Sequence, residues 1–235
     1  MQNAFGLPQF EGEELALADA DHNKLIKRAA NSVLKPNGLF QKGSSRIWID
    51  DNGWFLIIVE FQPSYWDKGS YLNVAVHYLW DDKDYLSYDY GHRVGSFVPF
   101  NGDEEKFRTE MHSLAQIALE KVKEYRQFND LQYAQNCILQ NKALHIVHTL
   151  YARMMICGLC RDNCAVSYFA ELMHVLESTD VAWTRKYYTE LSENIAPIIN
   201  DPQMLHSYVC EKIRLQREFW RSKSSMKKLR GEFVL

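Results

Sequence analysis

A run of three cysteines is the feature of this sequence that comes nearest, in residue type and spacing, to a reactive site. Cys157, Cys160 and Cys164 are separated by two and by three residues. Zinc prefers thiolate and imidazole ligands, so the three sulfurs with His148 would complete a tetrahedral set. His148 precedes Cys157 by nine residues, which corresponds to roughly 13 Å of helix rise. No second pair of residues at zinc-ligand spacing accompanies the run, and we therefore predict neither a metal site nor a cofactor.

A helix–turn–helix with buried thiols is the interpretation we prefer for this run. Gly158 would end one helix, and Asp162 or Asn163 would begin the next. A thioredoxin-like role is disfavoured because Cys157 closes a helix, where the helix dipole opposes a thiolate. The chain has five cysteines, an odd number, and no secretion signal. This predicts free thiols in a reducing compartment and a cytoplasmic location.

Polar side chains in or beside apolar, strand-like segments form a second group, which consists of Glu60, Gln62, Asn73, His77, His92 and Arg93. Of these, Glu60, Asn73, His77 and Arg93 are the candidate ligand-binding residues. If Glu60 and His77 share a face of a sheet, a carboxylate and an imidazole could act as acid and base. No nucleophile stands at a diagnostic spacing, and the glycine-rich, phosphate-loop and zinc-protease motifs are all missing. We predict no catalytic residue. The preferred interpretation is a polar network that fixes strand register, and a shallow ligand-binding site is the alternative.

The C-terminal segment, from about residue 202 to 231, is expected to form an amphipathic helix. Its narrow apolar stripe comprises Tyr208, Leu215, Phe219, Met226, Leu229 and Phe233. In the first half this face is widened by Leu205, Val209, Ile213 and Trp220. The candidate partner-binding residues are Tyr208, Leu215, Phe219, Trp220 and Met226. The other side is basic, with Arg214, Arg217, Arg221, Lys223, Lys227, Lys228 and Arg230. One interpretation is that the stripe packs onto the rest of the chain and the charges face solvent. The other is that the stripe docks a protein partner or a second copy of this chain.

The overall composition limits the classes of partner. The chain has 235 residues, of which 46% are hydrophobic and 24% charged, as expected for a protein with a packed core. A net charge of −3 gives no general affinity for nucleic acid, so we do not expect a nucleic-acid partner. The longest apolar run, 55–59, is far too short to span a membrane, and we expect no membrane association.

The first hundred residues predict a small antiparallel sheet. Residues 1–20 form an acidic arm that we expect to be extended, and a helix follows from 22 to 34. The segments 46–50 and 54–62 predict a β-hairpin in which Asn52-Gly53 forms a type I′ turn. Because 54–62 is apolar at nearly every position, we expect a central strand. Further strands are expected at 70–80, 85–90 and 93–100.

Everything after Asp103 shows helical periodicity. Helices are expected at about 103–127, 130–157, 163–178, 179–194 and 202–231. The predicted fold class is α+β, with an antiparallel β-meander flanked by helices and followed by an all-α bundle. The predicted organisation is an arm (1–20), a helix–sheet–helix domain (21–127) and a helical domain (128–235).

Three segments carry a resemblance to a known family. Leu39-Phe40-Gln41-Lys42-Gly43 precedes the hairpin, Val59-Glu60-Phe61-Gln62-Pro63-Ser64 ends it, and Gly69-Ser70-Tyr71-Leu72-Asn73-Val74 opens the next strand. Together they resemble an uncharacterised family of bacterial domains over about residues 25–100. The chain departs from that pattern at Leu39, which replaces the usual Gly-Phe order, and at Ala75, where Gly is common. The resemblance supports the order of the strands, and it implies no activity because the family has none established.

The function we expect is that of a non-enzymatic protein-interaction or regulatory module, with a protein partner or a second copy of the chain. The alternative is an enzyme or a small-ligand-binding protein whose site lies on the polar face of the sheet.

Overall fold

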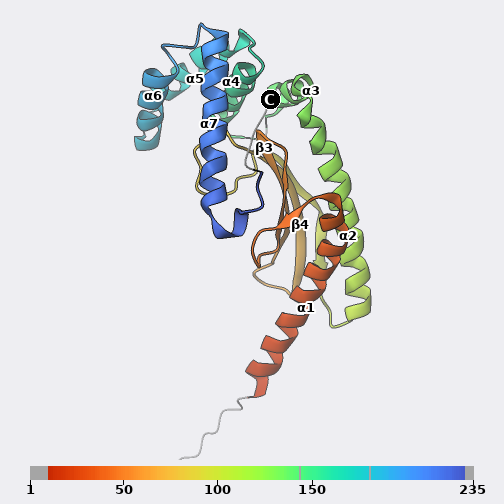
Figure 1. Cartoon of the computed structure of the whole chain (residues 1–235). Helices are drawn as coiled ribbons and strands as arrows, with labels where there is room; N and C mark the ends of the chain where they lie inside the picture. The colour runs from red at the N-terminus through yellow and green to blue at the C-terminus, as the bar shows by residue number, and fades with distance from the viewer. Residues whose placement is uncertain (1–9, 143, 180, 231–235) are drawn as a thin grey trace, which may run out of the picture. The chain divides into compact units, whose positions relative to one another are not determined.

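In the computed structural model the described residues form a five-stranded antiparallel sheet and seven α-helices, which confirms the predicted α+β class (Figure 1). The structure describes residues 10–142, 144–179 and 181–230, and side chains from residue 22 onward, except those of residues 143, 180 and 186. No helix in these ranges combines the length and apolar character that a membrane span requires.

The strands follow one another in the sheet in the order of the sequence, as a meander. They are β1 (Phe40–Gln41), β2 (Ile47–Asp51), β3 (Phe55–Gln62), β4 (Gly69–Tyr78) and β5 (Tyr90–Pro99). The prediction that 54–62 forms a central strand is confirmed, because β3 is the third of five strands and almost all its residues are buried. The strand expected at 93–100 is confirmed as the larger part of β5. The separate strand expected at 85–90 is wrong, because residues 85–89 form a loop and β5 starts at Tyr90.

The turn between β2 and β3 differs from the predicted type I′ turn. Gly53 has a φ of +81° but Asn52 is not among the residues with positive φ, whereas a type I′ turn needs both. The carboxylate of Asp51 accepts a hydrogen bond from Gly53 N (3.2 Å), and Asn52 N donates to Phe55 O (3.1 Å). The side chain of Asp51 therefore shapes a three-residue loop that the Asn-Gly pair alone did not indicate.

The chain divides into two compact units that both include parts of the sheet. The first contains the described residues up to Asp50, with Val59–Val74 and Arg93–Val122. The second contains Asp51–Ile58, Ala75–His92 and the described residues from Lys123 onward.

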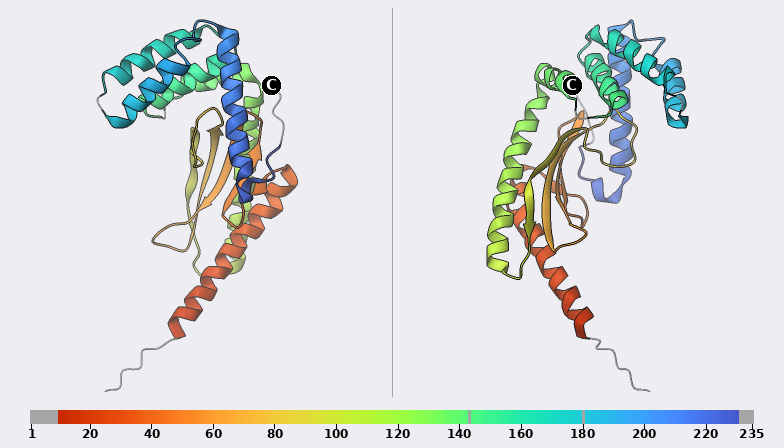
Figure 2. Two further views of the ribbon diagram at one scale, coloured as in Figure 1. Left: turned by 60° about the vertical axis from the view of Figure 1, so that its left-hand side comes forward. Right: turned by 180° about the vertical axis from the view of Figure 1, so that it is seen from behind.

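Aromatic packing and one hydrogen bond tie α1 (Phe10–Leu34) into the first unit. The His22 ring stacks on Phe100 with 5.7 Å between centroids and contacts Phe107 of α2 (Glu104–Tyr125). Trp48 Nε1 donates to Asn31 Oδ1 at 2.9 Å, which joins β2 to α1. Figure 2 shows α1 and α2 beside the strands.

The helix α1 begins earlier than expected. The predicted extended arm spans residues 1–20, yet the described part of it, from Phe10, is helical. Several good helix formers, including Glu and Ala, occupy 11–20 and can continue the helix that the apolar positions after residue 22 start. Residues 1–9 and the side chains of the acidic group in this segment lie outside the described parts.

The helices of the second unit pack mainly around α4, and α6 packs on α5. They are α3 (Leu131–Gln140), α4 (Ile146–Leu159), α5 (Cys164–Glu177), α6 (Ala182–Asn194) and α7 (Pro202–Ser222), with the 3-10 helices η2 (Arg126–Asn129) and η3 (Ser224–Met226). The helix α4 is buried on almost every side and packs against α3, α5 and α7.

Two helix predictions in this unit are wrong. The single helix expected at 130–157 is divided, because Asn141 adopts an extended conformation after α3 and the His145 ring accepts a hydrogen bond from Val147 N to start α4. The expected helix 202–231 ends at Ser222, because Lys223 is extended (φ −74°, ψ 130°). Local backbone conformations end both helices although the apolar periodicity continues.

A stack of large aromatic rings fills the sheet portion of the second unit. Trp54 lies parallel to Trp80 (5.0 Å between centroids, 7°) and to Phe128 of η2 (6.3 Å, 4°). Tyr78 contacts both tryptophans. Since each such side chain buries a large apolar area, this cluster supplies much of the hydrophobic stabilisation of this unit.

An ion pair between Asp51 and Arg217 lies inside the second unit. The Arg217 guanidinium donates to both carboxylate oxygens of Asp51 (2.7 and 2.9 Å) and to the carbonyls of Gly53 and Arg230. The two side chains are only 3% and 6% exposed. Burial raises the pKa of Asp51, but the hydrogen bonds from Arg217 and from the backbone of Arg230 outweigh it and lower the pKa below its usual value.

We predict that Arg217→Met destabilises the protein by about 3–5 kcal/mol, because it leaves the Asp51 carboxylate buried without a counterion. Urea unfolding at neutral pH measures the loss. The double variant Asp51→Asn with Arg217→Met should recover most of it. The matched control is Arg214→Met on the exposed side of the same helix, which should change stability little. Equal losses in the control and in Arg217→Met would contradict the role of the buried pair.

Candidate functional site

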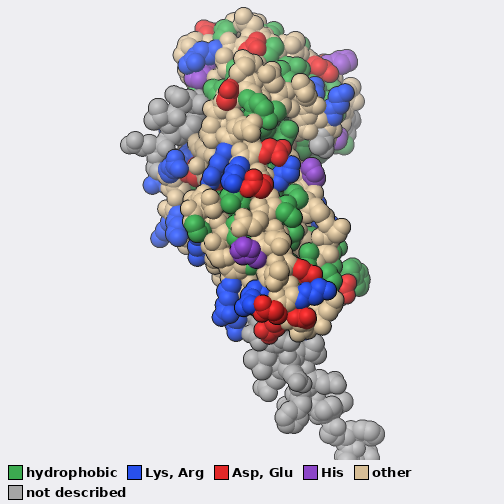
Figure 3. Space-filling view, turned by 90° about the vertical axis from the view of Figure 1, so that its right-hand side faces the viewer, with side chains coloured by type: hydrophobic (Ala, Val, Ile, Leu, Met, Phe, Trp, Pro, Cys, Tyr) green, Lys and Arg blue, Asp and Glu red, His purple; other side chains and the backbone are tan. Residues whose placement is uncertain are grey.

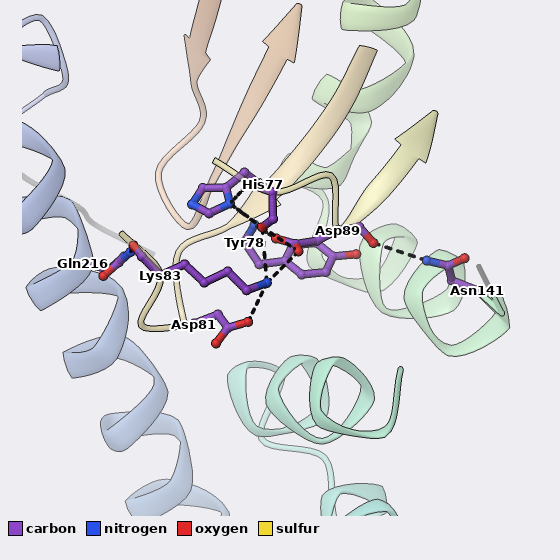
Figure 4. A network of polar contacts seen from close by, with 8 residues as sticks. His77, Tyr78, Asp81, Lys83, Asp89, Asn141 and Gln216 are labelled. Carbon is purple, nitrogen blue, oxygen red and sulfur yellow. Dashed lines mark hydrogen bonds and ion pairs between the residues drawn. The ribbon is translucent and has the colours of Figure 1, made fainter. Parts of the chain in front are cut away.

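A second buried polar network, besides the Asp51–Arg217 pair, is centred on Asp89 (Figure 4). Its carboxylate accepts hydrogen bonds from Tyr78 N (2.8 Å), the Ser87 hydroxyl (2.8 Å) and the Lys83 ammonium (2.9 Å). His77 Nδ1 lies 3.0 Å from Ser87 Oγ and 3.4 Å from the Asp89 carboxylate. Asp81 pairs with Lys83 from the other side at 2.7 Å.

This network unites serine, histidine and aspartate, the residue types of a hydrolytic triad, but its geometry differs from one. In a triad the imidazole bridges the two other groups through its two nitrogens. Here Ser87 and Asp89 both lie at Nδ1 of His77, and Nε2 is buried without a hydrogen-bond partner in the described part of the chain. The His77 ring meets Trp220 edge-on, with 5.9 Å between centroids. This arrangement suits a structural network.

The electrostatics of the network favour its ionised form. Burial raises the pKa of Asp89, but the hydrogen bond with His77 and the charge of Lys83 outweigh it, so the pKa of Asp89 lies far below its usual value. Burial lowers the pKa of Lys83, but Asp89 and Asp81 overcome this and raise it. The carboxylate and the ammonium therefore hold each other charged inside the fold.

Other elements of the second unit bind to the same loop. Gln216 of α7 donates to Lys83 O at 2.5 Å, and Asn141 donates to Asp89 O at 3.5 Å. Lys212 of α7 pairs with Asp82. The loop between β4 and β5 is thus fastened by side chains from helices that follow it much later in the sequence.

We predict that Asp89→Asn lowers the unfolding free energy at neutral pH by about 3–5 kcal/mol, because it removes the more deeply buried of the two counterions of Lys83 and weakens the charge-assisted hydrogen bonds that Tyr78 N and Ser87 donate to this carboxylate. Since the folded pKa of Asp89 is depressed, its contribution is present above the unfolded pKa of about 3.9 and is lost as the pH falls below it. Denaturant unfolding between pH 7 and pH 3 should show a smaller acid-induced loss in the variant than in the wild type.

The exposed Asp84 of the same loop offers the control for this measurement. Asp84→Asn should leave both the stability at pH 7 and the acid-induced loss nearly unchanged. An acid-induced loss in Asp89→Asn as large as in the wild type would show that Asp89 does not carry the effect.

The polar residues of the first unit form a separate cluster. Asn73 Nδ2 donates to the Glu60 carboxylate (2.9 Å) and to Gln62 Oε1 (2.9 Å), and Arg93 donates to the same oxygen of Gln62 at 2.8 Å. The Arg93 guanidinium lies 3.9 Å from the centre of the Tyr71 ring. The structure therefore brings together Glu60, Asn73 and Arg93 of the four candidate ligand-binding residues. His77 instead contacts Ser87, Asp89 and Trp220.

Two aromatic side chains on the loop 63–69 were not predicted as functional residues. Tyr65 and Trp66 are 91% and 86% exposed, and the centroids of their rings are 5.2 Å apart. We call the segment 63–69 the aromatic loop. A dipeptide of large aromatics within a turn-forming stretch, Pro63-Ser64-Tyr65-Trp66-Asp67, was the available sequence signal.

The aromatic loop is anchored at both ends. The Ser64 hydroxyl accepts hydrogen bonds from Trp66 N (3.1 Å) and Asp67 N (3.3 Å), and Phe100 N donates to Lys68 O at 2.8 Å. Gly69 has a φ of +147°, and a Cβ there would lie 2.2 Å from Val98 O, so only glycine fits. The loop thus presents Tyr65 and Trp66 from a defined base.

A pocket of about 460 Å³ lies beside the aromatic loop. It is lined by the loop itself together with His22 and Asn23 of α1 and Arg46. The Arg46 guanidinium donates to Gly69 O at 3.3 Å. Burial lowers the pKa of Arg46, although the charge of Glu60 opposes this effect. The pocket therefore combines basic side chains with two exposed aromatic rings.

The five candidate partner-binding residues of the C-terminal segment occupy different environments. Trp220 and Met226 are buried within the second unit, Tyr208 and Phe219 are half-buried, and Leu215 is exposed. The buried side of α7 is formed by Leu205, His206, Val209, Ile213, Gln216, Arg217 and Trp220. The face of α7 that can meet a partner thus comprises Tyr208, Leu215 and Phe219.

Contrary to the expectation of free thiols, two of the three cysteines of the run are not free. Cys157 and Cys164 form a disulfide between the end of α4 and the start of α5, which corrects that expectation for these two residues. Cys160 is free, and its thiol donates to Leu131 O. His148 stacks on Trp183 and is not part of the cysteine group.

Positive and negative side chains are mixed on one face of the molecule. On the face that carries α2, Lys, Arg, Asp and Glu side chains are interspersed with small groups of hydrophobic side chains (Figure 3).

Neither a family model, nor a curated protein, nor a solved structure matches this chain. The function is therefore inferred from the exposure, contacts and charges of the chain's own side chains.

Proposed function

We propose that this protein is a non-enzymatic interaction module of regulatory type that binds a partner protein through the aromatic loop. The observation that carries the proposal is the near-complete exposure of Tyr65 and Trp66 on a loop with a fixed base. Aromatic side chains of this size normally lose most of their solvent-accessible surface when a protein folds. An exposed pair with no role inside the fold is typical of a binding surface.

The energetics favour these two residues as anchors. Tryptophan and tyrosine are enriched among the few residues that carry most of the binding energy at protein interfaces. Full burial of one large apolar side chain contributes about 1.5–3 kcal/mol. Because Ser64 and Gly69 restrain the loop, less conformational entropy is lost on binding than with a free chain.

The chemistry of the neighbouring pocket indicates the kind of segment that fits. Arg46 and Lys68 are basic and Asp67 is acidic among the pocket residues, with His22 at the α1 side. We propose that the partner presents an apolar side chain to Trp66 and a carboxylate to the basic side of the pocket, an arrangement favoured by charge complementarity.

The remaining polar groups support binding over catalysis. The members of the Asp89 network are buried and bound to one another, with only Nε2 of His77 and the Tyr78 hydroxyl among the described residues of the network lacking a partner. Glu60, Gln62, Asn73 and Arg93 also hydrogen-bond one another. A ligand-binding site at this second cluster is the other candidate, because the guanidinium of Arg93 is exposed and lies on the Tyr71 ring.

The test is to identify a partner by affinity capture on the full chain and to titrate the purified partner against variants. Trp66→Ala should weaken binding at least about 30-fold, which corresponds to the roughly 2 kcal/mol that defines an anchor residue. Tyr65→Ala should weaken it less. Both variants should keep the stability of the wild type, because these side chains are exposed.

The matched control is Tyr85→Ala, since Tyr85 is also a largely exposed aromatic (60%) but lies on another loop. It should bind as the wild type does. Equal affinity of Trp66→Ala and wild type, with loss of binding in Arg93→Ala, would overturn the proposal in favour of the polar cluster. Equal loss in Tyr85→Ala and Trp66→Ala would also contradict it.

A further inference from the structure

The turn between α4 and α5 brings two thiol sulfurs and a carboxylate together. The sulfur atoms of Cys157 and Cys164 and a carboxylate oxygen of Asp162 all lie within 4.8 Å of one another. The backbone of Arg161 adopts the left-handed conformation (φ +56°), and Asp162 N donates to Cys157 O at 2.8 Å. This sharp reversal allows residues seven positions apart to face the same point.

A buried amide is directed at this group. Gln135 of α3 is only 4% exposed. Its Nε2 lies 2.8 Å from Asp162 Oδ2, 3.7 Å from Cys157 Sγ and 3.8 Å from Cys164 Sγ. The amide nitrogen of Gln135 thus contacts the carboxylate and both sulfurs, and it holds the carboxylate beside the two sulfurs. Such outer contacts commonly position metal ligands.

Cys164 and Cys157 lie at the two helix ends that the turn joins. Cys164 is the first residue of α5, a helix of 14 residues, and Cys157 lies in the last turn of α4. The short turn thus places both sulfurs beside the Asp162 carboxylate.

We propose that Cys157, Cys164 and Asp162 form a redox-controlled zinc site. In the dithiol form the two thiolates and the carboxylate bind one Zn²⁺, and oxidation to the disulfide closes the site. Sulfur and oxygen donors suit zinc, and three protein ligands leave a fourth position for water. Since each Zn–S bond is about 2.3 Å, two sulfurs on one zinc lie less than about 4.6 Å apart, and in the reduced form rotations about the Cα–Cβ bonds of the two cysteines bring the sulfurs to such a separation.

The two states are related by a balanced exchange. A dithiol reductant breaks the S–S bond by supplying two electrons and two protons, and its own two thiols become a disulfide. Zinc binding then displaces the two thiol protons to solvent. In either state a covalent or coordinate link joins the end of α4 to the start of α5, so the turn stays closed.

The experiment uses the full chain, reduced with a phosphine that is then removed under anaerobic conditions. Zn²⁺ alone is titrated against a chromophoric chelator. We expect one zinc per reduced chain and none per oxidised chain. Cys157→Ser and Cys164→Ser should abolish stoichiometric binding, and Asp162→Asn should weaken it at least about tenfold. Cobalt substitution should produce the absorption bands of a thiolate-bound metal.

Cys160→Ser is the matched control, because Cys160 lies in the same turn but outside the group. It should bind zinc as the wild type does. The exposed Asp162 keeps the test valid if a variant at the buried Cys157 fails to fold. Failure of the reduced wild type to bind zinc, equal binding by the oxidised chain, or equal loss in Cys160→Ser would overturn the proposal. None of these outcomes bears on the aromatic loop, which involves other residues.

Discussion

The second unit depends on the neutralisation of charge that its own fold buries. The Asp51 carboxylate sits where β2 ends, almost excluded from solvent, and its counterion Arg217 comes from 166 positions later in the chain. An ionised carboxylate in such surroundings is tolerated only when paired and hydrogen-bonded. The same requirement recurs at Asp89, which Lys83 neutralises while α7 holds the loop through Gln216. The Asp51–Arg217 pair and the hydrogen bond from Gln216 to Lys83 O join the strand ends to the C-terminal helix more specifically than apolar packing alone would.

This constraint has a consequence for function. Most polar side chains within the strands hydrogen-bond with one another, around Asp89 in one unit and among Gln62, Asn73 and Arg93 in the other, although Nε2 of His77 and the Tyr78 hydroxyl are buried without a partner among the described residues. The exposed rings of Tyr65 and Trp66 are groups of a different kind. Hydrogen-bonded networks of this extent make a fold rigid, which suits a scaffold that displays a binding loop.

Much of the fold was predictable because apolar periodicity reports burial directly. The segment 54–62, apolar at nearly every position, indicated a central strand, and the 3.6-residue pattern after Asp103 indicated helices. The failures share a cause, in that single side chains or backbone angles override the pattern. Asp51 reshaped the Asn52-Gly53 turn, and an extended Asn141 divided a helix. The candidate site was less predictable. Composition did not show that Tyr65 and Trp66 would be exposed, or that Cys164 would open a helix and meet Cys157, because both facts depend on tertiary structure.

Native-state hydrogen exchange of the intact chain tests most directly whether buried charge joins strand ends and helix into one cooperative unit. The informative amides are those of 55–58, 75–78 and 205–220, all within the second unit. If Asp51 and Asp89 fasten these segments together, the most protected amides of all three should exchange with the same opening free energy, equal to that of global unfolding. Exchange of the α7 amides through a much smaller opening free energy, with the strand amides still protected, would contradict the account.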